Sequence, residues 1–247
     1  MKTFYTMLKT ELKLSLRGMD MFIFAICMPL VLLVILGMLY GSKPAYDGAS
    51  YTFLEQSFAA LTTISICAGG VMGLPLVVSD YRSKKILKRF QVTPISPILI
   101  LLVQITIYTL YAVVSLLSLI LISMVVFDIR FQGTLLNFLG GYFLVMLSMF
   151  SIGMMVGGVA RDSKVASAVA SLLYFPMIIL SGATLPYEIM PIMLQKVSDV
   201  LPLTQGIKIL KAASLGLPLD SVLIPFIAMV ILAGVCIGIS LKYFRWE

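Results

Sequence analysis

Six long apolar segments, separated by shorter polar ones, make up most of the chain. A helix needs about 17–25 consecutive apolar residues to cross the hydrocarbon core of a bilayer. The segments that meet this length are residues 21–40, 59–78, 98–127, 135–159, 165–185 and 222–241. Their interiors hold no charged residue, and a charge at mid-span opposes insertion by about 2.5–3.5 kcal/mol. The pattern therefore predicts an all-α membrane protein with six transmembrane helices.

Basic residues mark one side of the predicted bundle. If the N-terminus lies in the cytoplasm, so do residues 79–97, residues 160–164 and the segment after the sixth span. These segments hold 13 of the 18 Lys and Arg residues. Cytoplasmic loops of membrane proteins carry an excess of Lys and Arg. We therefore expect both ends of the chain to be cytoplasmic (N-in/C-in).

Residues 1–18 precede the first span and are amphipathic. Lys9, Lys13 and Arg17 follow one another at four-residue spacing, beside an apolar face. This spacing predicts a helix that lies in the cytoplasmic membrane interface, with its cations among anionic lipid headgroups. A disordered basic tail is the alternative.

Residues 186–220, between the fifth and sixth spans, hold two apolar stretches that are each too short to span. They cover residues 189–201 and 203–215, and Pro202 separates them. Proline breaks a helix, and apolar segments of this length are often re-entrant or interfacial. We expect an outer re-entrant helical hairpin here, with a plain surface loop as the alternative.

The composition agrees with this fold and excludes several functions. Hydrophobic residues make up 60% of the chain and charged residues 12%, about half the charged fraction of a soluble domain. The basic residues lie between apolar runs, so the net charge of +7 does not predict nucleic-acid binding. There is no histidine, and the three cysteines have no metal-ligand spacing, so no metal site is predicted.

The chain has no sequence feature that would power transport by itself. The nucleotide-binding pattern GxxxxGK[ST] does not occur. No titratable acid or base sits at mid-span, which counts against an ion-coupled carrier and against a membrane enzyme. The source of energy is therefore expected on a partner.

The basic loop at residues 79–97 is the expected contact with that partner. We expect Ser79 or Asp80 to cap a short helix that runs to Arg89 and has one basic side and one apolar side. The loop ends in Thr93-Pro94 and Ser96-Pro97, which stop a helix. A loop that only sets the topology is the alternative.

Four stretches, in order along almost the whole chain, resemble type-2 ABC transporter permeases. Residues 86–97 resemble the first cytoplasmic loop, which docks on the ATPase as a coupling helix. Residues 161–171 resemble the second cytoplasmic loop and the start of the fifth span. Residues 175–186 resemble the Pro…Ser-Gly…Pro signature at the outer end of that span. Residues 201–205, Leu-Pro-Leu-Thr-Gln, resemble the outer re-entrant helices. The family often has Glu-rich sequence at the coupling helix, where this chain has Asp80 and several lysines.

The resemblance implies a single permease domain over residues 1–247 in the bacterial cytoplasmic membrane. Such permeases pair with a second copy or a paralogue around a pathway. Separate ATPase subunits bind ATP and Mg²⁺, so no cofactor is expected on this chain, and it is not expected to be an enzyme. The residues expected to couple to the ATPase are Asp80, Arg82, Lys84, Lys85, Ile86, Lys88, Arg89 and Phe90.

Polar and small residues in two spans are candidates for the pathway or the dimer interface. They are Thr62, Ser65 and Gly69 on one face of the second span, and Ser167, Ser171, Tyr174 and Met177 in the fifth. The expected outer gate comprises Ser181, Gly182, Pro186 and Pro202. Methionine and aromatic side chains beside small polar groups favour an amphipathic substrate, such as a drug, antibiotic, peptide or lipid-like molecule. A non-transporting scaffold or immunity protein and an ion-coupled carrier are the alternatives.

Overall fold

The computed structural model describes residues 2–41, 43–46, 48–86, 97–129, 131–182, 187, 190–218 and 222–244. Within these ranges the chain forms helices and no strand, with one isolated antiparallel bridge between Pro44 and Thr52. Six helices in the described part are long and apolar enough to cross a membrane: Ile23–Tyr40, Phe53–Ser83, Ile98–Phe127, Leu135–Val159, Ser163–Leu180 and Leu223–Tyr243. The predicted all-α class with six spans is confirmed.

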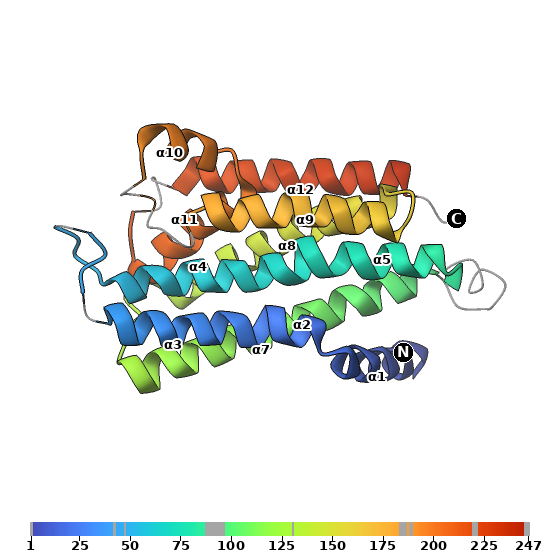
Figure 1. The fold of residues 1–247 in the computed structure, drawn as a ribbon, viewed down its shortest axis with the longest axis horizontal. Coiled ribbons are helices and arrows are strands. Elements are labelled where there is room, and N and C mark those ends of the chain that lie inside the picture. The colour runs from blue at the N-terminus through green and yellow to red at the C-terminus, as the bar shows by residue number, and fades with distance from the viewer. Residues whose placement is uncertain are drawn as a thin grey trace.

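The second span is the central helix of the bundle (Figure 1). It runs without a break through α4 (Phe53–Cys67), the π-helical segment η2 (Ala68–Gly73) and α5 (Leu74–Ser83). Within its most apolar stretch, 83% of the residues are buried in the chain itself. Four other spans and α11 surround it. The neighbours that pack on it are α3 (Met28–Tyr40), α7 (Pro97–Phe127), α8 (Leu135–Val159), α9 (Ser163–Leu180) and α11 (Pro202–Leu215).

A capping box starts this central span earlier than its hydropathy predicts. The Thr52 hydroxyl accepts from the Glu55 amide at 3.2 Å, and the Glu55 carboxylate accepts from the Thr52 amide at 2.7 Å. Each side chain thus satisfies a backbone N–H group that the first helical turn leaves without a partner. The predicted span at residues 59–78 was therefore too short at its N-terminal end.

Glycines let the central span approach the fourth span at backbone distance. A methyl group added to Gly153 of α8 would lie 1.9 Å from the carbonyl oxygen of Gly70, so only glycine fits. Gly157 lies in the same way against Pro75 and Val78. These glycines therefore serve packing within one subunit, as small residues do between membrane helices.

A separate helix precedes the first span and lies beside the bundle. Helix α1 (Lys2–Gly18) packs on α7, and the Ser15 and Tyr111 hydroxyls share a 2.7 Å hydrogen bond. The short helix α2 (Asp20–Phe22) and the π-helical segment η1 (Ile23–Cys27) then lead into α3. The helix expected at residues 1–18 is present, while its placement in a membrane interface stays a prediction.

The fifth span ends earlier than predicted. Helix α9 stops at Leu180 rather than at residue 185, and Gly182 follows with a φ of +82° that favours glycine. Two short helices come next, α10 (Ile192–Ser198) and α11, and Pro202 is the first residue of the second. The predicted pair of helices divided by Pro202 is thus present; their entry into the membrane stays a prediction.

The last span, α12 (Leu223–Tyr243), packs along α8. Its C-terminal end lies at the same end of the bundle as α1, the end of α5 and the start of α7 (Figure 1). Helices α10 and α11 lie at the opposite end. The described residues of the expected coupling loop, 79–86, and those of the expected gate thus lie at opposite ends of the bundle.

Candidate functional site

The last turn of α5, which leads into the coupling loop, is anchored to α8 by a buried arginine. Arg82 is 5% exposed, and its Nη1 donates to the carbonyl oxygens of Gly157, Gly158 and Ala160 at 2.9, 3.0 and 2.7 Å. These carbonyls lie at the C-terminal end of α8, where the helix dipole favours a positive charge. Arg82 therefore connects the second span to the fourth, and its side chain is buried within the chain.

The remaining described residues of the expected coupling site lie around the end of α5. Asp80 and Lys84 form an exposed ion pair at 2.8 Å, and Lys85 is exposed with a φ of +55°. Ile86 is half-buried, and Lys88, Arg89 and Phe90 lie outside the described residues.

The expected cap at the start of this site is wrong. Ser79 and Asp80 lie inside α5, because that helix continues to Ser83; the Ser79 hydroxyl donates to the Leu76 carbonyl. Because Arg82 is buried, the exposed cations in the described part of the expected coupling site are Lys84 and Lys85.

A second polar contact anchors the same turn to α1 and α7. The Tyr81 hydroxyl donates to the Glu11 carboxylate. Gln104 donates to the same carboxylate at 3.0 Å and to the Tyr81 hydroxyl at 3.0 Å. Sequence reasoning missed this contact, which joins residues up to 93 positions apart. Tyr81 and Arg82, neighbours in sequence, thus fix the end of α5 on opposite sides.

The polar residues predicted on the second span lie inside the subunit. Thr62 and Ser65 are 1% and 2% exposed, and the Ser65 hydroxyl donates to the Ala25 carbonyl of η1 at 2.6 Å. Gly69 lies against the ring of Tyr108. Packing between the first, second and third spans accounts for Ser65 and Gly69, and a role in a pathway stays a prediction for all three.

The residues predicted in the fifth span lie on two parts of α9, a face that is buried in the chain and an edge that is half-buried. Tyr174 and Met177 are buried, while Ser167 and Ser171 are half-buried. The Ser171 hydroxyl lies 4.0 Å from the sulfur of Met72 in η2. The opposite face of α9 is exposed and apolar, with Leu172, Phe175 and Ile179 between 56% and 74% exposed.

At the other end of the bundle, polar contacts hold the residues of the expected gate. Ser181 is buried, and the Ser198 hydroxyl donates to the Leu180 carbonyl, which ties α10 to the end of α9. Of the four gate residues, Pro186 lies outside the described part of the chain.

A charged cluster lies beside these residues. Lys208 pairs with Asp199 at 2.6 Å, and Tyr187 donates to the same carboxylate. Burial acts to raise the pKa of Asp199, but the hydrogen bonds from Lys208 and Tyr187 and the Lys208 charge outweigh it and hold that pKa below its usual value. The carboxylate therefore stays charged at neutral pH.

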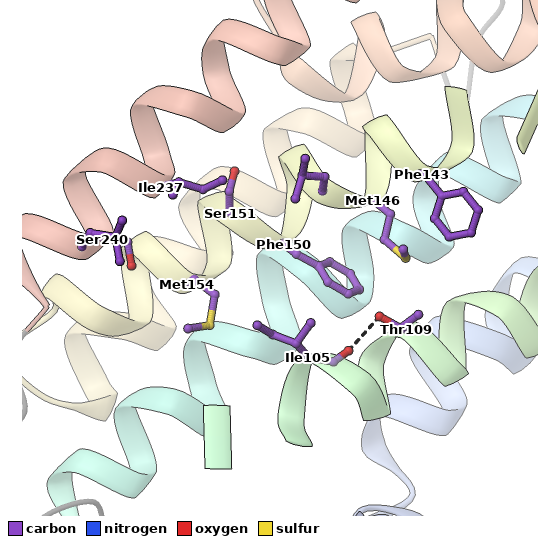
Figure 2. A pocket seen from close by; sticks show the side chains of 11 residues that line it. Ile105, Thr109, Phe143, Met146, Phe150, Ser151, Met154, Ile237 and Ser240 are labelled. Carbon is purple, nitrogen blue, oxygen red and sulfur yellow. Dashed lines mark hydrogen bonds between the residues drawn. The ribbon is translucent and has the colours of Figure 1, made fainter. Parts of the chain in front are cut away.

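Figure 2 shows an apolar pocket of about 510 Å³ between α7, α8 and α12. Its walls are formed mainly by side chains such as Met146, Phe150 and Met154 of α8. The Thr109 hydroxyl donates to the Ile105 carbonyl at 2.8 Å and that of Ser151 to the Ser148 carbonyl at 2.7 Å, each within its own helix. Because both hydroxyls already donate within their own helices, the walls of the pocket are mainly apolar and suit a hydrocarbon group.

Comparison with known proteins identifies the family to which the chain belongs. A family model described as "ABC-2 type transporter" matches residues 2–215, and the chain belongs to this family. Nodulation protein J of Neorhizobium galegae is 31% identical over 98 residues, which are 40% of this chain and 35% of that relative. The chain thus matches about a third of the length of this curated relative.

Family membership decides among the functions that the sequence left open. The chain is the membrane-spanning permease component of an ABC transporter rather than its ATPase, and the family implies pairing with such an ATPase. It is a multi-pass protein of the bacterial inner membrane.

Proposed function

We propose that this chain is the permease subunit of an ABC exporter, paired with a second copy or a paralogue around the translocation pathway. The observation that carries the pairing concerns α9. This helix has the lowest mean hydropathy of the six spans, yet only 22% of its residues are buried within the chain. The fourth span, which is also among the less apolar ones, is 61% buried in its apolar stretch.

Ser163, Ser167 and Ser171 repeat at four-residue spacing along the half-buried edge of α9. Hydrocarbon offers these hydroxyls no partner, whereas small polar residues support close contact between membrane helices. This edge would therefore contact a second subunit or line the pathway between two subunits. The predicted roles of Ser167 and Ser171 rest on this argument, while those of Tyr174 and Met177, which are buried within the chain, stay predictions.

We propose that the ATPase, which binds ATP and Mg²⁺, acts on the turn at the end of α5. Lys84 and Lys85 would meet acidic residues of the ATPase, and Arg82 and Tyr81 would pass the motion to α8, α1 and α7. Helix α11, which packs through Gly206 against Thr63 and Val145, would form the outer gate with the end of α9. The substrate is proposed to be amphipathic.

Charge reversal in the coupling turn tests this function. The double variant Lys84→Glu/Lys85→Glu should lower ATP-driven transport by about tenfold, because complementary charges between the partners become like charges. The measurement is ATP-dependent uptake into inside-out vesicles that hold the chain and its ATPase, where uptake corresponds to export.

The matched control reverses two lysines at the opposite end, Lys43→Glu/Lys196→Glu, both exposed. This control should transport like the unaltered chain. Full transport by the Lys84→Glu/Lys85→Glu variant would contradict the coupling role. ATP-dependent loss of substrate from the same vesicles would contradict export.

A further inference from the structure

A cavity of about 430 Å³ lies between α1, α5 and α7, at the end of the bundle that holds α1. Its volume is within the range of small-molecule sites, which runs from about 300 to 1,000 Å³. The polar contact between Glu11, Tyr81 and Gln104 forms one of its walls. The cavity therefore combines an opening between helices with fixed polar groups.

The cavity is acidic in a chain that is otherwise basic. Glu11 and Asp80 line it, and no Lys or Arg is among the described residues of its wall. Asp80 pairs with Lys84, but the donors to Glu11 within the described part of the chain are two neutral groups, the Tyr81 hydroxyl and the Gln104 amide. Glu11 is half-buried. A half-buried carboxylate with neutral partners attracts a cation.

A buried tyrosine gives a second, independent indication of a ligand. Tyr108 lines the cavity and is 2% exposed, and its hydroxyl has no hydrogen-bond partner within the described part of the chain. Its ring lies over Gly73, where an added methyl group would come within 2.4 Å of it. The hydroxyl of a tyrosine buried to this extent usually has a hydrogen-bond partner, so one that opens onto a cavity indicates a partner inside that cavity.

The rest of the wall is apolar. Leu14 of α1, Met21 of α2 and Val77 of α5 line the cavity beside the acidic groups. Leu14 is 55% exposed, which places the mouth of the cavity next to α1. Such a wall suits a hydrocarbon or aromatic body, and an aromatic ring such as that of Tyr108 also attracts cations.

We propose that this cavity binds an amphipathic organic cation. Its protonated amine would lie against Glu11, with the Tyr108 hydroxyl as a further acceptor, and its apolar body would lie among Leu14, Met21 and Val77. Such a molecule is either a lipid with an amine headgroup, as in phosphatidylethanolamine, or a cationic amphiphile for export. The second source rests on the proposed function; the binding site itself does not.

Two fluorescent probes that differ in one charge test the site. Dansylcadaverine carries a terminal ammonium, and its N-acetyl derivative is neutral. The full chain in detergent should bind the cation about tenfold more tightly than the neutral probe, because a charge-assisted contact to Glu11 is present for one probe alone. The measurement is dansyl fluorescence, titrated against empty micelles.

Variants locate the site. Glu11→Gln removes the charge and keeps an acceptor for Tyr81, so the preference for the cation should fall about tenfold while the neutral probe binds as before. Asp128→Asn removes one negative charge at an exposed position outside the cavity, and it should leave the binding of both probes unchanged. Tyr108→Phe should weaken binding of the cation severalfold. Equal binding of the two probes, or an unchanged preference in Glu11→Gln, would overturn the proposal.

The two sources give different results in bilayers. Nanodiscs with phosphatidylethanolamine in place of phosphatidylcholine should displace the probe if the ligand is a lipid headgroup. ATP-dependent uptake of dansylcadaverine by inside-out vesicles identifies a transported amphiphile. Because the binding measurement needs no ATPase, its failure would leave the exporter function standing, and a failure of coupling would leave the binding site standing.

Discussion

The carbonyl groups at the end of α8 depend on a side chain from another span. Arg82 Nη1 lies within 3.0 Å of three of them, and the residue is 5% exposed. Because Nη1 carries two hydrogens, the three carbonyl oxygens share its N–H groups, and the positive charge strengthens each contact. The contact therefore acts as a C-terminal cap supplied from outside the helix.

Removal of this cap should destabilise the chain. Arg82→Ala leaves the carbonyls of Gly157, Gly158 and Ala160 without their donor, at an expected cost of about 2–3 kcal/mol. Arg82→Lys should recover part of that loss, since it keeps a positive charge near the C-terminal end of α8 on a side chain of different shape. Thermal unfolding of the purified protein in detergent measures both.

Lys84→Ala is the control for this experiment, because Lys84 is exposed and its ion pair with Asp80 contributes little. Equal melting temperatures for Arg82→Ala and Lys84→Ala would show that the contact does not stabilise the fold.

The sequence identified the basic turn but could not divide its residues by role. Arg82, Lys84 and Lys85 are all cations within one helical turn, and only the position of α8 separates the buried one from the exposed two. The contact between Glu11 and Gln104 was also beyond reach, since nothing local relates α1 to α7. A usable signal existed: Glu11 is the one acidic residue in 1–18, and Gln104 the one amide in 98–127.

At the scale of helices, hydropathy predicted the bounds of the third and fourth spans better than those of the central one. The third and fourth spans begin and end as predicted, at residues 98–127 and 135–159. The central span is longer than predicted at both ends, because Glu55 and Arg82 look like loop residues in sequence. Glu55 has its partner three residues away, in the capping-box pattern Thr52-x-x-Glu55 that the sequence displays, whereas Arg82 meets the carbonyls of α8 only in the fold.

The approach of α8 to the central span gives a prediction at this scale. Gly153→Ala should destabilise the bundle by about 1–3 kcal/mol, because its methyl group would overlap the Gly70 carbonyl oxygen. The melting temperature in detergent is the readout.

Gly234→Ala in α12 is the matched control, since an added methyl group there has no neighbour within 4 Å. It should be neutral or slightly stabilising, because alanine favours helix more than glycine does. A Gly153→Ala protein as stable as the control would mean that the two spans are farther apart than described.

At the scale of the whole molecule, the two ends of the bundle carry different charges and are expected to carry different tasks. The end with α1 holds most of the basic residues and the proposed coupling turn, and the end with α10 and α11 holds the expected gate. Orientation in the bilayer follows from the excess of Lys and Arg.

Cysteine labelling in intact cells tests that orientation. Lys196→Cys on α10 should react with a membrane-impermeant maleimide, while Lys9→Cys on α1 should react only after permeabilisation; both lysines are exposed. The unaltered chain gives the background, since Cys67 and Cys236 are buried and Cys27 is partly so. The reverse pattern of labelling would place the N-terminus outside.

The shortage of neighbours around α9 has a consequence for the life of the protein in the cell. If two copies pair as proposed, a subunit that has not yet met its counterpart leaves the serine edge of α9 in hydrocarbon, which lowers the stability of the lone chain. Membrane proteases remove marginally stable chains faster than stable ones. The abundance of this permease would then follow that of its assembly partners, so that an unpaired copy is degraded before it can accumulate.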